Sequence, residues 1–312
     1  MGSRVPVRQS FVVLCLALAA AITAVPEPGR AAAEEGIVTS ASTTLSGSRP
    51  LSSLERRIQD ERETEEKQFV ITSHRPNYIL PLTYNWHVNT APYGPEGERF
   101  SPVEIKFQIS FKMPIAENVF GDNGNVYLAY TQLSFWQAYN HDISSPFRET
   151  NYEPEAFLMF DTDVSVLGLR NRLAGVGLVH QSNGRTETLS RSWNRIYAQF
   201  ILDHRNFVLS VKPWYRFNES AETDDNPDIN RYMGPGEVRL LYEWKKYVAA
   251  LLLRCNFRPD NLYGAVEVEG SFPIGQKLKG YVQYFYGYGE SLIDYNARTS
   301  RFGIGILLSD WL

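Results

Sequence analysis

From residue 77 to the C-terminus, the sequence consists of short segments in which apolar and polar side chains alternate. The clearest segment is residues 105–113, where Ile, Phe and Met occupy the odd positions and Lys, Gln and Ser the even ones. Side chains of a β-strand point alternately to its two faces, so this pattern predicts strands with one apolar and one polar face. Gly, Pro, Asn or Asp bounds each segment, as is typical of turns.

The sequence contains twelve such segments. They are approximately residues 77–88, 103–113, 125–138, 154–165, 172–182, 190–202, 206–217, 236–246, 247–257, 262–273, 277–288 and 300–312. A soluble sandwich would also alternate, but an even number of strands and lengths near ~9 to 11 residues are typical of membrane barrels. The 18 Tyr, 17 Phe and 6 Trp residues favour the same conclusion. We therefore predict an all-β fold, a twelve-stranded antiparallel transmembrane β-barrel.

Residues 1–33 have the composition of a secretory signal peptide. Two arginines precede an apolar run over residues 11–25, and small residues follow it as far as Ala33. This run is too short for a spanning helix, and no later apolar run approaches the ~20 residues that such a helix needs. We expect export through the periplasm to the outer membrane, with cleavage after Ala33 or after Ala24.

Residues 34–75 are rich in Ser and Thr and then in charged residues, which predicts a flexible or partly helical extension. A solvated linker is the preferred interpretation, with the barrel domain over residues 76–312. The formal net charge of −4 gives no support for nucleic acid as a partner. Cys15 lies in the predicted signal peptide, so Cys255 is left alone and an intramolecular disulfide is excluded.

Residues 180–194 can place a nucleophile, a base and an orienting group on one face of a β-hairpin. His180 and Ser182 are two residues apart, so on a strand they point the same way. If the returning strand pairs Ser182 with Ser192, Asn194 lies opposite His180, with Cβ atoms about 5 Å apart. The rest of this face is apolar: Ala174, Val176, Leu178, Ile196, Ala198, Phe200 and Leu202. Such an outward group suits a substrate that resides in a membrane.

Three segments combine with the barrel pattern to match a known family. They are YTQLSFWQ (130–137) leading into SSPFRETNYEP (144–154), the hairpin at 180–195, and TDDNPDI (223–229); GYGESLIDYN (287–296) also fits. In these segments the chain resembles the outer membrane phospholipase A family, which comprises calcium-dependent acyl hydrolases of Gram-negative outer membranes. The resemblance implies a twelve-stranded barrel with its active site on the outer surface. It also implies Ser182 as nucleophile, His180 as base and Asn194 as orienting residue.

The same resemblance implies a Ca²⁺ cofactor and a homodimer as the active form. The ligands would be the Arg185 carbonyl, the Ser190 hydroxyl and an oxygen of Ser144 from a second subunit. A weaker calcium position would use Asp225 and Glu187, where Glu187 stands in place of the usual Asp.

Gln132 is the candidate for the dimer interface. Alternation places it on the face of its strand that meets lipid, where an unpaired carboxamide is costly. Family dimers pair such a glutamine across the interface.

The leading hypothesis is calcium-dependent hydrolysis of acyl esters of (lyso)phospholipids in the outer membrane, activated by dimerisation. The alternative is a catalytically silent structural or porin-like barrel, and a planar-bilayer recording distinguishes the two. Inward-facing Lys106, Lys112 and Arg195 are expected to form a hydrogen-bonded interior, and a barrel filled in this way gives no steady conductance. An outer-membrane protease would need an acidic cluster at the extracellular rim, which the sequence does not show.

Overall fold

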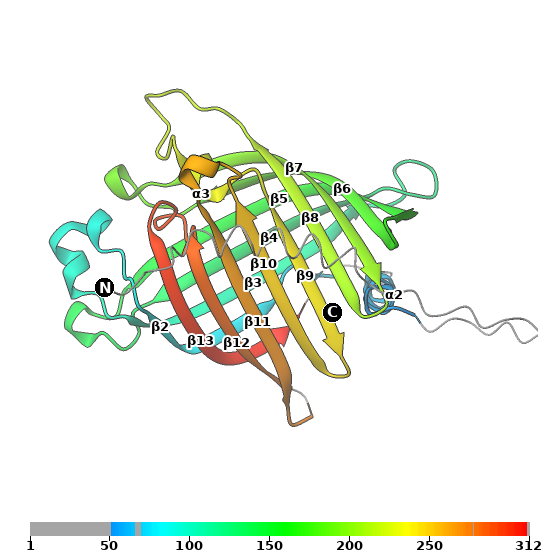
Figure 1. Cartoon of the computed structure of the whole chain (residues 1–312), viewed down its shortest axis with the longest axis horizontal. Helices are drawn as coiled ribbons and strands as arrows, with labels where there is room; N and C mark the ends of the chain where they lie inside the picture. The colour runs from blue at the N-terminus through cyan, green and yellow to red at the C-terminus, as the bar shows by residue number, and fades with distance from the viewer. Residues whose placement is uncertain (1–50, 66–69, 277, 311–312) are drawn as a thin grey trace, which may run out of the picture. The chain divides into compact units, whose positions relative to one another are not determined.

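The computed structural model describes residues 51–65, 70–276 and 278–310; the predicted signal peptide and the first part of the predicted extension lie outside them. Within these residues, twelve long strands form a closed antiparallel β-barrel (Figure 1). They are β2 (Asn77–Asn85), β3 (Val103–Ala116), β4 (Asn125–Trp136), β5 (Phe147–Val166), β6 (Leu169–Ser182), β7 (Ser192–His204), β8 (Phe207–Arg216), β9 (Gly236–Trp244), β10 (Tyr247–Cys255), β11 (Gly264–Ile274), β12 (Leu278–Tyr288) and β13 (Arg298–Ser309). The predicted fold is confirmed.

Strand order follows the sequence. Each strand pairs with the next along the chain, and β13 pairs with β2 to close the wall. A two-residue strand, β1 (Thr72–Ser73), adds to β3. Among the described residues no helix has the length and apolar character needed to cross a bilayer.

The two faces of the strands separate apolar from charged side chains. Large apolar side chains such as Leu128, Leu178 and Ile304 are 42–53% exposed on the outer wall. Charged side chains such as Lys106 and Arg301 are buried inside. This is the inverse of a water-soluble protein and is the distribution that a lipid-facing barrel requires.

Ion pairs fill the interior. Glu104 binds Arg148 Nε at 2.7 Å and Arg301 Nη1 at 2.9 Å. Glu290, from the loop before β13, binds Lys106 Nζ and Arg301 Nε, each at 2.9 Å. All five side chains are at most 2% exposed, so each charge depends on its partners rather than on water.

The two ends of the barrel differ in the length of their connections. Residues 167–168 join β5 to β6 and residues 205–206 join β7 to β8, whereas residues 217–235 join β8 to β9 at the other end. Bacterial outer-membrane barrels have short periplasmic turns and longer extracellular loops. The loop between β6 and β7, residues 183–191, therefore lies at the extracellular end.

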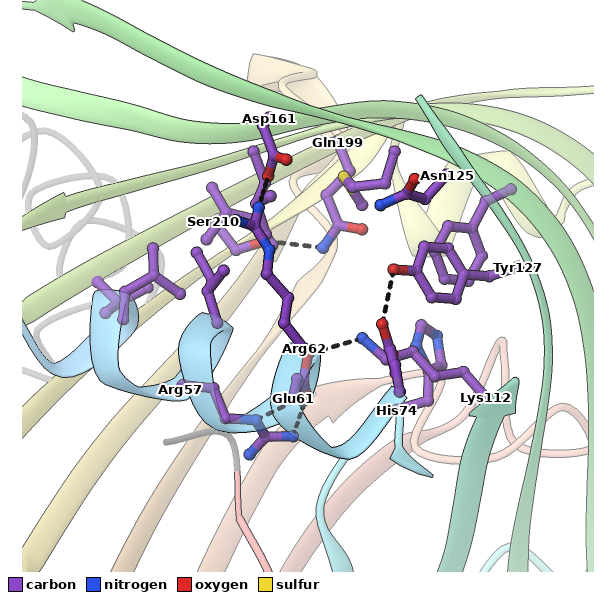
Figure 2. A pocket seen from close by; sticks show the side chains of 18 of the residues that line it. Arg57, Glu61, Arg62, His74, Lys112, Asn125, Tyr127, Asp161, Gln199 and Ser210 are labelled. Atoms are coloured by element: carbon purple, nitrogen blue, oxygen red, sulfur yellow. Dashed lines mark hydrogen bonds and ion pairs between the residues drawn. The ribbon is translucent and has the colours of Figure 1, made fainter. Parts of the chain in front are cut away.

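Helix α2 (Ser53–Glu65) lies at the end with the short turns, where β7 and β8 are joined (Figure 1). Leu54 is 5% exposed and packs in a cluster with Val208 and Leu241. Figure 2 shows the cavity between this helix and the barrel wall, where Glu61 binds Lys112 Nζ at 2.9 Å. This part of the predicted extension is therefore a packed helix rather than a solvated linker.

Candidate active site

The predicted hairpin is present with the predicted register. His180 on β6 lies opposite Asn194 on β7, and Ser182 lies opposite Ser192. His180 Nδ1 is 2.8 Å from Asn194 Oδ1. The amide oxygen only accepts, so this bond assigns the imidazole proton to Nδ1 and leaves Nε2 as the basic atom.

Ser182 lies at the extracellular end of β6, on the face that also carries His180. It is half-buried, between Tyr152 on β5 and Ser192 on β7. Within the described part of the chain, its hydroxyl makes no hydrogen bond. Bonds between a nucleophile and its base are often long in resting enzymes and shorten in the substrate complex, so the shared face is the informative feature.

Apolar side chains surround these three residues on the outer wall. Val176, Leu178 and Ile196, which share their face, are 42–53% exposed, and Tyr215 on β8 lies opposite Ile196. Acyl chains of lipids can pack against such a surface. An ester next to it would meet the polar groups of the hairpin.

Glu219 is a neighbour of this site that the sequence did not predict. Asn194 Nδ2 donates to Glu219 Oε1 at 3.4 Å. The backbone N–H of Phe217 donates to the Asn194 carbonyl at 2.9 Å, which extends the pairing of β7 beyond the end of β8. Strand alternation gives no information about Glu219, because it lies in the loop that follows β8.

Several of the predicted calcium ligands lie on the loops beside the hairpin. Ser190 Oγ donates to Asp225 Oδ2 at 2.6 Å, so two of these residues are in contact. The Arg185 guanidinium donates to the carbonyls of Phe147 and Arg148 at 2.9 and 3.0 Å, which explains its side chain as a link between the loop and β5.

Oxygen donors of this kind fit a hard cation. None of the hydrogen bonds of the described residues ends on the Arg185 carbonyl oxygen, and Ca²⁺ prefers carbonyl, hydroxyl and carboxylate oxygens. Glu187 begins the short helix η3 (Glu187–Leu189) in the same loop and is exposed. Across the described chain, no group of three or more His, Cys, Asp or Glu side chains could hold a metal.

Ser144 and Gln132 lie toward the neighbouring strands. Ser144 follows the short helix η2 (His141–Ile143) with a left-handed φ of 61°, in the loop between β4 and β5. Gln132 is on the outer face of β4, where its amide accepts from Tyr130 at 3.2 Å and donates to Ser134 at 3.1 Å. The amide oxygen and the amide nitrogen of Gln132 thus both have partners within β4. To pair across a dimer interface, Gln132 would exchange these hydrogen bonds for bonds to the second subunit.

A family model described as phospholipase A1 matches residues 54–308, which include α2 and nearly the whole barrel. The chain belongs to the phospholipase A1 family. It is 42% identical over 253 residues to a putative phospholipase A1 of Neisseria meningitidis, covering 77% of this chain and 65% of that protein. It is 38% identical over 255 residues to phospholipase A1 of Klebsiella pneumoniae, covering 80% of this chain and 85% of that one.

Solved structures agree with this family. The barrel is similar to outer membrane phospholipase A from Escherichia coli, with a TM-score of 0.74 and 38% identity over 78% of this chain and 100% of that one. It is also similar to the calcium-bound dimer of the Salmonella typhi outer membrane phospholipase, with a TM-score of 0.74 and 37% identity over 80% of this chain and 96% of that one. The predicted family and the predicted outer-membrane location are confirmed.

Proposed function

We propose that this protein hydrolyses acyl esters of phospholipids in the outer membrane, with Ser182 as nucleophile, His180 as general base and Asn194 as orienting residue. The observation that carries the proposal is the 2.8 Å hydrogen bond between His180 and Asn194 on the lipid-facing wall, beside Ser182. The name phospholipase A1, borne by the relatives, supports the reaction class.

In this mechanism, His180 Nε2 takes the proton of the Ser182 hydroxyl as Ser182 Oγ attacks the ester carbonyl carbon. His180 then gives this proton to the departing lysophospholipid oxygen as the ester C–O bond breaks, leaving an acyl group on Ser182. A water molecule, deprotonated by His180, attacks the acyl group and releases the fatty acid. The proton returns to Ser182 Oγ, which restores the enzyme.

Ca²⁺ is proposed as the cofactor of this site. The Arg185 carbonyl and the Ser190 hydroxyl would hold it, together with Ser144 of a second subunit, and Asp225 would support a weaker position with Glu187. When bound, the cation polarises an ester carbonyl and stabilises negative charge on its oxygen. This contribution matters because Asn194 is neutral and stabilises the imidazolium form of His180 less than a carboxylate would.

Dimerisation is proposed as the activating event, because the ligand set is incomplete without Ser144 of a second subunit. The relative from Salmonella typhi whose structure is a dimer with bound calcium supports this step. Gln132 is the proposed contact between the two barrels.

The test is acyl release from phospholipid by the refolded protein, in calcium and in chelator. Ser182→Ala should abolish release, whereas Ser192→Ala, which removes the hydroxyl directly opposite on β7, should retain it. Release by Ser182→Ala equal to that of wild type would contradict the proposal. Steady conductance in a planar bilayer, with no release in any condition, would instead support a porin-like barrel.

A further inference from the structure

The orientation of the Asn194 carboxamide decides whether His180 can act as a base. One end of this group accepts hydrogen bonds and the other donates, and a half-turn about the last side-chain bond exchanges them with little change in shape. With Oδ1 toward His180, the imidazole proton is on Nδ1 and Nε2 is free to take the Ser182 proton. With Nδ2 toward His180, the proton would be on Nε2 and the serine proton would have no acceptor.

Glu219 stabilises the first of these two orientations of the Asn194 amide relative to the second. Its Oε1 accepts from Asn194 Nδ2 at 3.4 Å, while Asn194 Oδ1 faces His180 Nδ1 at 2.8 Å. An ionised carboxylate accepts hydrogen bonds but cannot donate, so it attracts the amide nitrogen and repels the amide oxygen. The reversed orientation would therefore place two acceptors against each other at Glu219.

The backbone holds Glu219 near this amide. The Phe217 N–H donates to the Asn194 carbonyl at 2.9 Å, so the segment that carries Glu219 is tied to the residue on which it acts. Glu219 is also half-buried, which reduces the competition of water for its carboxylate.

We propose that Glu219 is a positioning residue of the hairpin site, whose carboxylate holds the Asn194 amide with its oxygen toward His180. The inference rests on the proposed function of His180, Ser182 and Asn194. Glu219 touches neither substrate nor the reacting atoms and acts only through Asn194. Partners that orient the ligands of a metal site typically contribute roughly ten- to a hundredfold in activity, and we expect an effect at the lower end of this range for Glu219.

The first experiment compares kcat and KM for Glu219→Ala and Glu219→Gln at saturating calcium. Glu219→Ala should lower kcat by about tenfold with KM unchanged, because the amide loses its preferred orientation without a change in lipid contact. Glu219→Gln, which keeps an accepting oxygen, should lie between Glu219→Ala and wild type. Glu222→Ala, in the same loop, is the matched control and should retain the wild-type kcat. An unchanged calcium midpoint shows that the loop carrying Asp225 is intact.

The second experiment repeats Glu219→Ala in an Asn194→Asp background. A carboxylate at position 194 accepts from His180 in either orientation, so it needs no positioning partner, and the nearby Glu219 then only adds like charge. Glu219→Ala should therefore leave kcat unchanged or raise it in this background. Equal losses in both backgrounds would indicate a structural role and overturn the inference.

The outcomes separate this inference from the proposed function. If Ser182→Ala is active, the proposed function fails whatever Glu219 does. If Ser182→Ala is inactive but Glu219→Ala equals wild type, only the role of Glu219 is overturned. Heat-dependent electrophoretic mobility verifies that each barrel is folded, and Glu219→Gln decides the question if Glu219→Ala does not fold.

Discussion

Replacing Glu290 by alanine leaves two buried cations without the carboxylate that lies between them. Glu290 binds Lys106 Nζ and Arg301 Nε, each at 2.9 Å, and all three side chains are at most 2% exposed. Removing one partner of a buried ion pair costs about 3–5 kcal/mol, because the remaining charge has lost its water without compensation. Here Arg301 keeps Glu104 at 2.9 Å and Lys106 has Glu267 at 3.8 Å, which places the expected loss near the lower value.

We therefore expect Glu290→Ala to lower the free energy of unfolding by ~3 kcal/mol, roughly a hundredfold in the equilibrium constant. Urea unfolding in lipid vesicles, followed by tryptophan fluorescence, measures this difference. Arg170→Ala is the control, since Arg170 and Asp163 form an exposed pair at 3.1 Å that contributes at most ~1 kcal/mol. Losses within 1 kcal/mol of each other in the two variants would refute the dependence of the barrel on its interior charges.

Two further predictions concern α2 and the outer wall. Burial alone would raise the pKa of Glu61, but the charges of Lys112 and Arg57 outweigh it and hold this pKa below its usual 4.5. Ionised Glu61 thus stabilises the folded state above about pH 4.5, and the advantage of wild type over Glu61→Gln in free energy of unfolding should shrink as pH falls below that value. Gln132→Leu should weaken dimerisation in calcium by roughly three- to thirtyfold, measured by sedimentation equilibrium in detergent, since one hydrogen bond between spanning segments contributes about 0.6–2 kcal/mol. An unchanged dimer constant would remove Gln132 from the interface.

The geometry of the candidate hairpin could be predicted because its information is local. Once β6 and β7 are recognised as strands joined by a loop, a period of two decides that His180, Ser182 and Asn194 share a face. The register follows from pairing Ser182 with Ser192, and the structure has this pairing. The spacing of these residues in the sequence was therefore sufficient to predict how they are arranged.

The predicted start of β5, at residue 154, is wrong by seven residues, because the strand begins at Phe147. Pro154 resembles a strand boundary, yet it lies within β5 opposite Tyr130. The preceding residues include Arg148 and Glu153, which are buried. Arg148 binds Glu104 on β3, and Glu153 binds Arg75 in the segment between β1 and β2. Their pairing depends on closure of the barrel, which local sequence does not reveal.

Helix α2 shows the same limit. Its charged residues predict solvent exposure, and Arg62 is exposed, but Glu61 is half-buried and binds Lys112 on the barrel wall. Lys112 is far from Glu61 in the sequence. Glu219 was missed for a related reason, since its contact with Asn194 depends on the path of the loop after β8.

Because side chains alternate along the strands of the hairpin, neighbouring residues face opposite sides of the barrel wall. Asn194 faces lipid, while Trp193 and Arg195 on either side face the lumen, where the Arg195 guanidinium lies 4.0 Å from the Trp193 ring centre. Inserting one residue into β7 ahead of Asn194 would exchange these two faces, turning the Asn194 amide inward and the charged Arg195 side chain toward hydrocarbon. A change in the length of these strands by two residues would preserve both faces, whereas the loop at 183–191 is constrained separately, because it carries Arg185 and Ser190, two of the proposed calcium ligands.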